Sequence, residues 1–135
     1  MKHEKVFVLP CSGIGKVYGL LSREAAQNVV LDLEPNSTEL ICLASLLLDE
    51  IKEPLKNRSV ICIDGCPKCC AEKSSLEAGM KVEKKYLTSQ FMKKYRGEDP
   101  GTGSVLTEVG DKIATEIAKT IQEDVRVILQ NRREE

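Results

Sequence analysis

Four of the six cysteines stand in one short stretch, and their arrangement indicates sulfur chemistry. The stretch reads Cys62-Ile63-Asp64-Gly65-Cys66-Pro67-Lys68-Cys69-Cys70, so an apolar run ends at Asp-Gly and leads directly into thiols. The other two, Cys11 and Cys42, also follow apolar runs. Thiolates bind zinc and iron–sulfur clusters, and they are the nucleophiles of redox enzymes. These residue types therefore predict a metal or thiol site.

The spacing of the thiols after Gly65 leaves the ligand pair open. Cys66 and Cys69 have the spacing common in zinc knuckles, whereas Cys66 and Cys70 would lie one helical turn apart. A helix that begins here would lower the thiol pKa of Cys66, and this effect could extend to Cys69. Lys16 and Lys68 are close enough in sequence to offset the charge of several thiolates.

Runs of β-branched and apolar residues alternate with stretches of helical periodicity. Strands are expected at residues 5–10, 38–43, 59–64, 81–88 and 124–129. Helices are expected from about residue 15, over 44–51, over 66–78 with Gly79 as the stop, and from a cap at Ser104. A helix throughout 38–51 is the competing interpretation of the second strand.

Strands that alternate with helices predict an α/β fold, a three-layer, Rossmann-like domain with a mainly parallel sheet. A chain of 135 residues is expected to form a single domain over 1–135. Within it, 5–88 carries the cysteine motifs, 104–130 a C-terminal helix and strand, and 131–135 a frayed tail. All strands of a parallel sheet end at one edge, so thiols that follow different strands are expected to meet there.

At these residues the sequence resembles the DGC domain family of zinc-binding proteins, which is named for the motif present here as Asp64-Gly65-Cys66. The resemblance covers roughly residues 5–88 and includes Cys11-Ser12-Gly13, Cys42-Leu43-Ala44 and the segment from Asp64 to Ala71. It implies that zinc is bound by Cys11, Cys42, Cys66 and Cys70. Cys69 departs from the family pattern, because it adds a thiol beside the expected ligand.

Other residues of the motif have structural explanations. Cys62 lies within an apolar strand and is expected to fill the core, because a free cysteine packs as a small hydrophobic residue. Asp64 is expected to be a turn residue whose carboxylate accepts nearby N–H groups.

Two enzyme templates do not fit the segment that begins at Cys11. The phosphate loop of small tyrosine phosphatases and related arsenate reductases has Arg where this chain has Val17, so the group that binds the phosphoryl oxygens is missing. A nucleotide P-loop fails as well, because Pro10 replaces its first glycine and no Ser or Thr follows Lys16.

Composition limits the classes of partner that the protein is expected to bind. Twenty basic and 21 acidic residues give a net charge of −1, and aromatic residues are few, so neither nucleic-acid nor membrane binding is expected. No run of about 18 apolar residues and no signal-peptide pattern is present, which favours the cytoplasm. Free thiols persist under such reducing conditions.

The sequence therefore predicts a metal-binding module that holds zinc as a carrier, sensor or structural protein. One alternative is a thiol redox or sulfur-transfer enzyme that uses Cys66 with Cys69 or Cys70. A third is an iron–sulfur protein, because thiolates also suit an iron–sulfur cluster.

Overall fold

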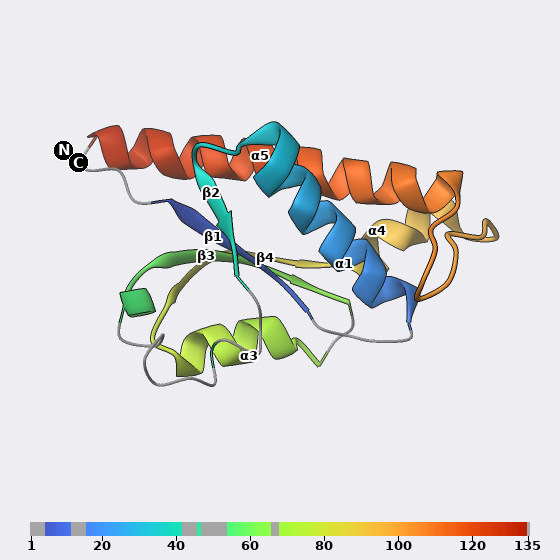
Figure 1. Ribbon diagram of the computed structural model, residues 1–135, viewed down its shortest axis with the longest axis horizontal. Helices are drawn as coiled ribbons and strands as arrows, with labels where there is room; N and C mark the ends of the chain where they lie inside the picture. Colours follow the sequence, from blue (N-terminus) through green and yellow to red (C-terminus); the bar gives the residue numbers. More distant parts are fainter. Residues whose placement is uncertain (1–4, 12–15, 42–45, 47–53, 66–67, 135) are drawn as a thin grey trace.

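A four-stranded parallel sheet forms the centre of the computed structural model, which describes residues 5–11, 16–41, 46, 54–65 and 68–134. The strands are β1 (Val6–Pro10), β2 (Thr38–Leu40), β3 (Ser59–Asp64) and β4 (Lys81–Leu87). Their order in the sheet is β2-β1-β3-β4 (Figure 1). Every strand pair is parallel, which confirms the predicted α/β fold.

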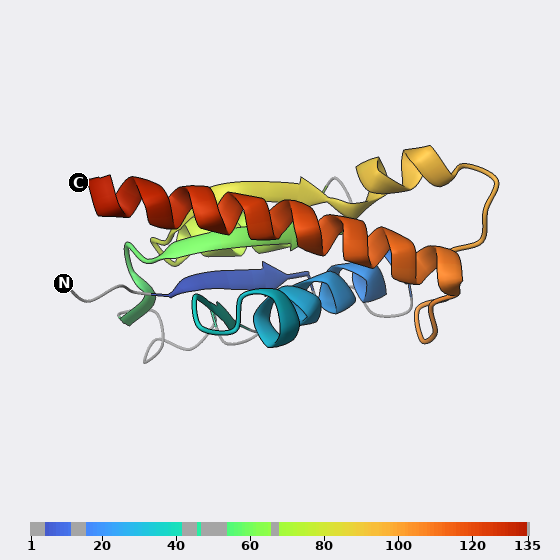
Figure 2. The ribbon, with the colours of Figure 1, turned by 90° about the horizontal axis from the view of Figure 1, so that it is seen from above.

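Helices cover both faces of this sheet and produce the three layers (Figures 1 and 2). Helix α1 (Val17–Gln27), the π-helix η1 (Asn28–Leu33) and helix α5 (Glu108–Glu134) pack on one face, and α3 (Cys70–Glu77) packs on the other. Successive residues of a strand point to opposite faces. Thus Val6 and Val8 join the core under α1 and α5, whereas Phe7 and Leu9 join the core under α3.

The C-terminal part of the chain corrects two expectations. Residues 124–129 were predicted to be a strand and 131–135 a frayed tail, but α5 continues as one helix from Glu108 to Glu134. The buried stripe keeps helical spacing beyond Ile121 through Val125 and Ile128, while Val127 is 53% exposed. A strand would place Val125 and Val127 on the same face. The predicted cap at Ser104 is also wrong, because the Thr107 hydroxyl accepts the N–H of Gly110 (3.2 Å).

Helix α3 ends as the sequence predicts. Gly79 has a φ of +78°, which glycine adopts easily, and its N–H donates to the carbonyl of Leu76 (3.1 Å). The N–H of Met80 donates to the carbonyl of Ser75 (3.0 Å), which completes a Schellman motif. The described helix starts at Cys70, later than the expected residue 66; residues 66 and 67 lie outside the described part.

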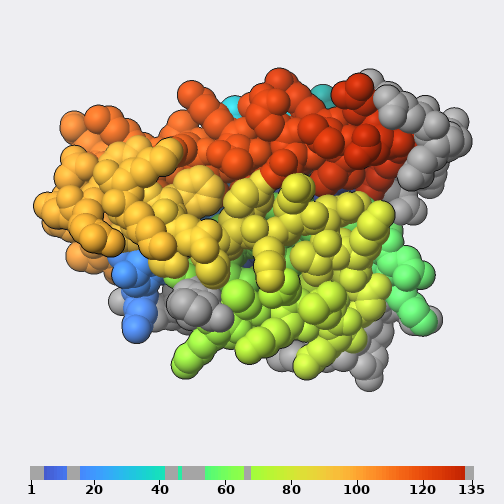
Figure 3. Space-filling model, turned by 180° about the vertical axis from the view of Figure 1, so that it is seen from behind, coloured from blue at the N-terminus to red at the C-terminus, as the bar shows by residue number. Residues whose placement is uncertain are grey.

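The edge strand β4 is polar, and it connects the sheet to a short helical segment. Lys81, Lys84 and Lys85 are exposed, and charged side chains discourage pairing with another strand. The segment that contains β4 is drawn in yellow on the face of the molecule seen in Figure 3. Beyond β4 come α4 (Thr88–Phe91) and the 3₁₀ helix η3 (Met92–Tyr95). None of the described helices has the length and apolar composition needed to cross a bilayer.

Candidate metal centre at the carboxyl edge of the sheet

Cys11 lies at the carboxyl edge, beside the end of β3. Its N–H donates to the carbonyl of Ile63 (2.8 Å), so the pairing of β1 with β3 continues one residue beyond the strand. The side chain is 8% exposed. The thiol also donates to the hydroxyl of Ser22 on α1, at 3.7 Å. The thiol is therefore held between the sheet and α1.

Gly65 connects this thiol to the Asp-Gly-Cys motif. The backbone N–H of Gly65 donates to Cys11 Sγ at 3.2 Å. A Cβ at position 65 would lie 2.9 Å from the Cβ of Tyr18 and 3.3 Å from Cys11 Sγ. The glycine of the motif is thus required for close approach between the β3 loop, α1 and the sulfur.

Asp64 positions the start of α3. Its carboxylate is buried and accepts the N–H of Ala71 at 2.8 Å and the N–H of Glu72 at 3.3 Å. These N–H groups belong to the first turn of α3, which has no partner for them within the helix. Burial raises the pKa of Asp64, and the two backbone hydrogen bonds oppose that change. The expectation that Asp64 accepts nearby N–H groups is confirmed.

Cys69 and Cys70 stand at the same helix start in different settings. Cys69 precedes the helix with a left-handed φ of +52°, and Cys70 is its exposed first residue. Burial raises the pKa of the Cys69 thiol, and Asp64 and Glu72 raise it further. This direction is opposite to the lowering at Cys69 that the sequence suggested for a helix N-terminus.

Cys62 is a core residue, as expected. It is completely buried under α3, and its sulfur lies 3.4 Å from the hydroxyl of Ser75. Burial raises the pKa of its thiol to about 12. Cys62 is therefore a neutral packing group.

Two of the predicted ligands, Cys42 and Cys66, lie outside the described residues. Their neighbours are described: Ile41 donates its N–H to the carbonyl of Val8 (3.1 Å), and Gly65 contacts Cys11. Within the described ranges, no three His, Cys, Asp or Glu side chains form a group that could hold a metal ion. The four-cysteine ligand set stays a prediction.

The sequence did not identify three further residues at this edge. Tyr18 offers its backbone carbonyl to the hydroxyl of Ser22 (3.0 Å) and to that of Thr88 (3.3 Å). Ser22 and Thr88 are both completely buried. No pattern in the sequence marks them, because polar or charged residues follow each one directly, Arg23 after Ser22 and Ser89 after Thr88.

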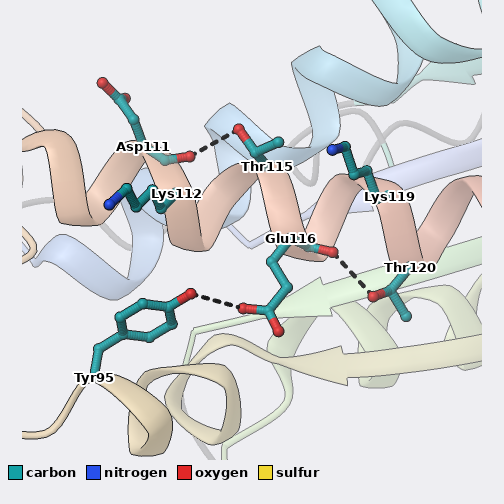
Figure 4. A pocket seen from close by; sticks show the side chains of 7 residues that line it. All are labelled: Tyr95, Asp111, Lys112, Thr115, Glu116, Lys119 and Thr120. Atoms are coloured by element: carbon teal, nitrogen blue, oxygen red, sulfur yellow. Dashed lines mark hydrogen bonds between the residues drawn. The ribbon is translucent and has the colours of Figure 1, made fainter.

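A separate depression of about 550 Å³ lies on the outer side of α5 (Figure 4). It is lined by Tyr95 and by polar side chains of the helix, and the hydroxyl of Tyr95 donates to Glu116 at 3.1 Å. Its described lining contains no cysteine, so it is distinct from the thiol site.

One of three comparisons with known proteins finds a match. The family model described as the DGC domain matches residues 7–117. The match extends past the expected limit of residue 88 and includes the first part of α5. No curated protein and no solved structure matches the chain.

Proposed function

The chain belongs to the DGC domain family, and we propose that it binds one zinc ion through thiolates at the carboxyl edge of its sheet. The proposed ligands are Cys11, Cys42, Cys66 and Cys70. Zinc would join three distant segments of the chain, which suits a carrier, a sensor or a structural metal site.

The hydrogen bond from Gly65 to Cys11 Sγ is the observation that carries this proposal. Gly65, the residue directly before Cys66, is held against the sulfur of Cys11, and consecutive Cα atoms are about 3.8 Å apart in any chain. Sulfur atoms about 2.3 Å from a tetrahedral zinc are about 3.8 Å from each other.

The other two proposed ligands are supported by strand pairing and by helix capping. Ile41, the residue before Cys42, donates its N–H to Val8 of β1, and paired strands lie about 4.8 Å apart, so the chain leading to Cys42 runs beside β1. Cys70 begins the helix that Asp64 holds against the end of β3. Four thiolates satisfy the coordination of zinc and leave no open position for a substrate.

The thiol redox alternative has no observation in its favour among the described residues. Such an enzyme needs an attacking thiolate of low pKa. At the partly buried Cys69, a candidate partner of Cys66, desolvation and the carboxylates of Asp64 and Glu72 raise the pKa. Cys66 itself lies outside the described residues. No described residue favours an iron–sulfur cluster over zinc.

Metal content tests the proposal. Elemental mass spectrometry of protein purified without oxygen should find about one zinc ion per chain. Serine substitution of any proposed ligand should reduce that content strongly. Cys62→Ser and Cys69→Ser are the matched controls and should retain zinc. Unchanged stoichiometry in the four ligand variants would reject the assignment.

The same preparation separates the alternatives. Brown colour with visible absorption would indicate iron and sulfide, which contradicts zinc as the native metal. A metal-free protein that forms a reversible disulfide between Cys66 and Cys69 or Cys70 would support the redox enzyme instead.

A further inference from the structure

Thr88 occupies a central position between the two segments that carry Cys11 and the Asp-Gly-Cys motif. It lies directly after β4 and is completely buried. Its hydroxyl is 3.3 Å from the carbonyl of Tyr18 on α1 and 3.4 Å from the carbonyl of Gly65. A threonine hydroxyl has a single proton, so these nearly equal distances indicate one donor shared by two acceptors.

The two carbonyls belong to two chain segments that adjoin proposed ligands. Gly65 donates its own N–H to Cys11 Sγ, and its carbonyl belongs to the peptide bond that leads to Cys66. Tyr18 is in the first turn of α1, the helix that follows Cys11 in the chain. The hydroxyl of Thr88 therefore fixes the Gly65 peptide relative to the segment that follows Cys11.

We infer that Thr88 is a positioning residue for the proposed zinc site, acting through the peptide of Gly65 on the separation between Cys11 and Cys66. This inference rests on the proposed function. Thr88 lies outside the cysteine motifs and does not contact Cys11 Sγ in any described hydrogen bond. Groups that orient metal ligands in this way typically contribute 10–100-fold, as an order of magnitude, to metal affinity.

Thr38 provides a matched control. It is a buried threonine whose hydroxyl also donates to a backbone carbonyl, that of Glu34 at 2.7 Å. Thr38 begins β2 and pairs with Val6 at the start of β1, so it lies at the end of the sheet opposite to Cys11. Thr38→Val thus removes a comparable hydrogen bond away from the site.

The experiment measures zinc affinity by competition with a chromophoric chelator, together with the thermal unfolding of the metal-free protein. Thr88→Val should bind zinc roughly 10–100-fold more weakly than the wild type. Thr88→Ser should restore the affinity, and Thr38→Val should lower the unfolding temperature without weakening zinc binding. With Co²⁺ in place of zinc, the thiolate-to-metal absorption band should change in Thr88→Val alone.

Two outcomes overturn the inference while the proposed function stands: wild-type affinity in Thr88→Val, or an equal loss of affinity in Thr38→Val. A wild type that binds no zinc overturns the inference and the proposed function together. If Thr88→Val does not fold, Thr88→Ser and Thr88→Ala make the same comparison, because they differ only in the hydroxyl. Equal zinc affinity in that pair would also overturn the inference.

Discussion

Replacement of Gly65 by alanine should destabilise the protein through a steric clash that no rotamer change can relieve. The new Cβ would lie 2.9 Å from the Cβ of Tyr18 and 3.1 Å from its carbonyl carbon, where ordinary contacts begin at 3.4 Å. Both Tyr18 atoms are fixed to the backbone of α1. Either the helix or the β3 loop must therefore shift by roughly half an ångström.

The expected cost follows from this displacement. Overpacking of a tight interior site costs about 1–3 kcal/mol. The shift also weakens the hydrogen bond from Gly65 to Cys11 Sγ, which is worth about 1 kcal/mol. We expect Gly65→Ala to lower the free energy of unfolding by about 2–4 kcal/mol, a large part of the 5–15 kcal/mol typical of a domain.

Urea unfolding of the metal-free protein, with a chelator present, measures this loss. Gly97→Ala is the control. Gly97 has a φ of +88° and open space around it, so an alanine there would strain the backbone without a steric clash. Its cost should be about 1–2 kcal/mol. Tyr18→Ala should not rescue Gly65→Ala, because alanine keeps the Cβ. A loss below about 0.5 kcal/mol in Gly65→Ala would refute the reasoning.

Three further predictions concern buried groups. Cys62→Ala should cost about 1 kcal/mol by opening a small cavity, and the wild-type Cys62 thiol should react with a thiol reagent only as the protein unfolds. Labelling of Cys62 in the folded protein faster than the protein unfolds would contradict the burial of this side chain. Asp64→Ala should lower the free energy of unfolding in urea by about 1–2 kcal/mol, because α3 loses the acceptor of two N–H groups, and an unchanged value would show that water replaces it. Asp124→Asn should raise the unfolding temperature at pH 7. Burial raises the pKa of Asp124 despite Lys84, so the charged form weakens the fold, and the gain should vanish below the ordinary carboxyl pKa of 3.8. A gain that persists at pH 3 would contradict this sign.

The structural role of the Asp-Gly-Cys motif could be predicted only in part from the sequence. That Asp64 accepts backbone N–H groups follows from the local sequence, since aspartate commonly does so at turns. The identity of its donors, Ala71 and Glu72, depends on where α3 begins. The late start of that helix, after a left-handed Cys69, was not evident from the sequence.

The C-terminal error has an equally specific cause. Residues 124–129 contain two valines, an isoleucine and a leucine, a composition typical of strands. The 3.6-residue period set by Ile113, Ile117 and Ile121 continues through Val125. Burial of this stripe against α1 and η1 stabilises the helix more than local β propensity favours a strand.

By itself, the sequence determined the α/β fold and the core role of Cys62, because β1 and β3 are short apolar runs that are stable only when both faces are covered. Only the tertiary structure decided how Gly65 is used. Its N–H meets a sulfur 54 positions away in the chain, and its carbonyl meets a hydroxyl 23 positions away. Local periodicity contains no information about such contacts, because they arise when strands and helices that are distant in sequence pack at one edge of the sheet.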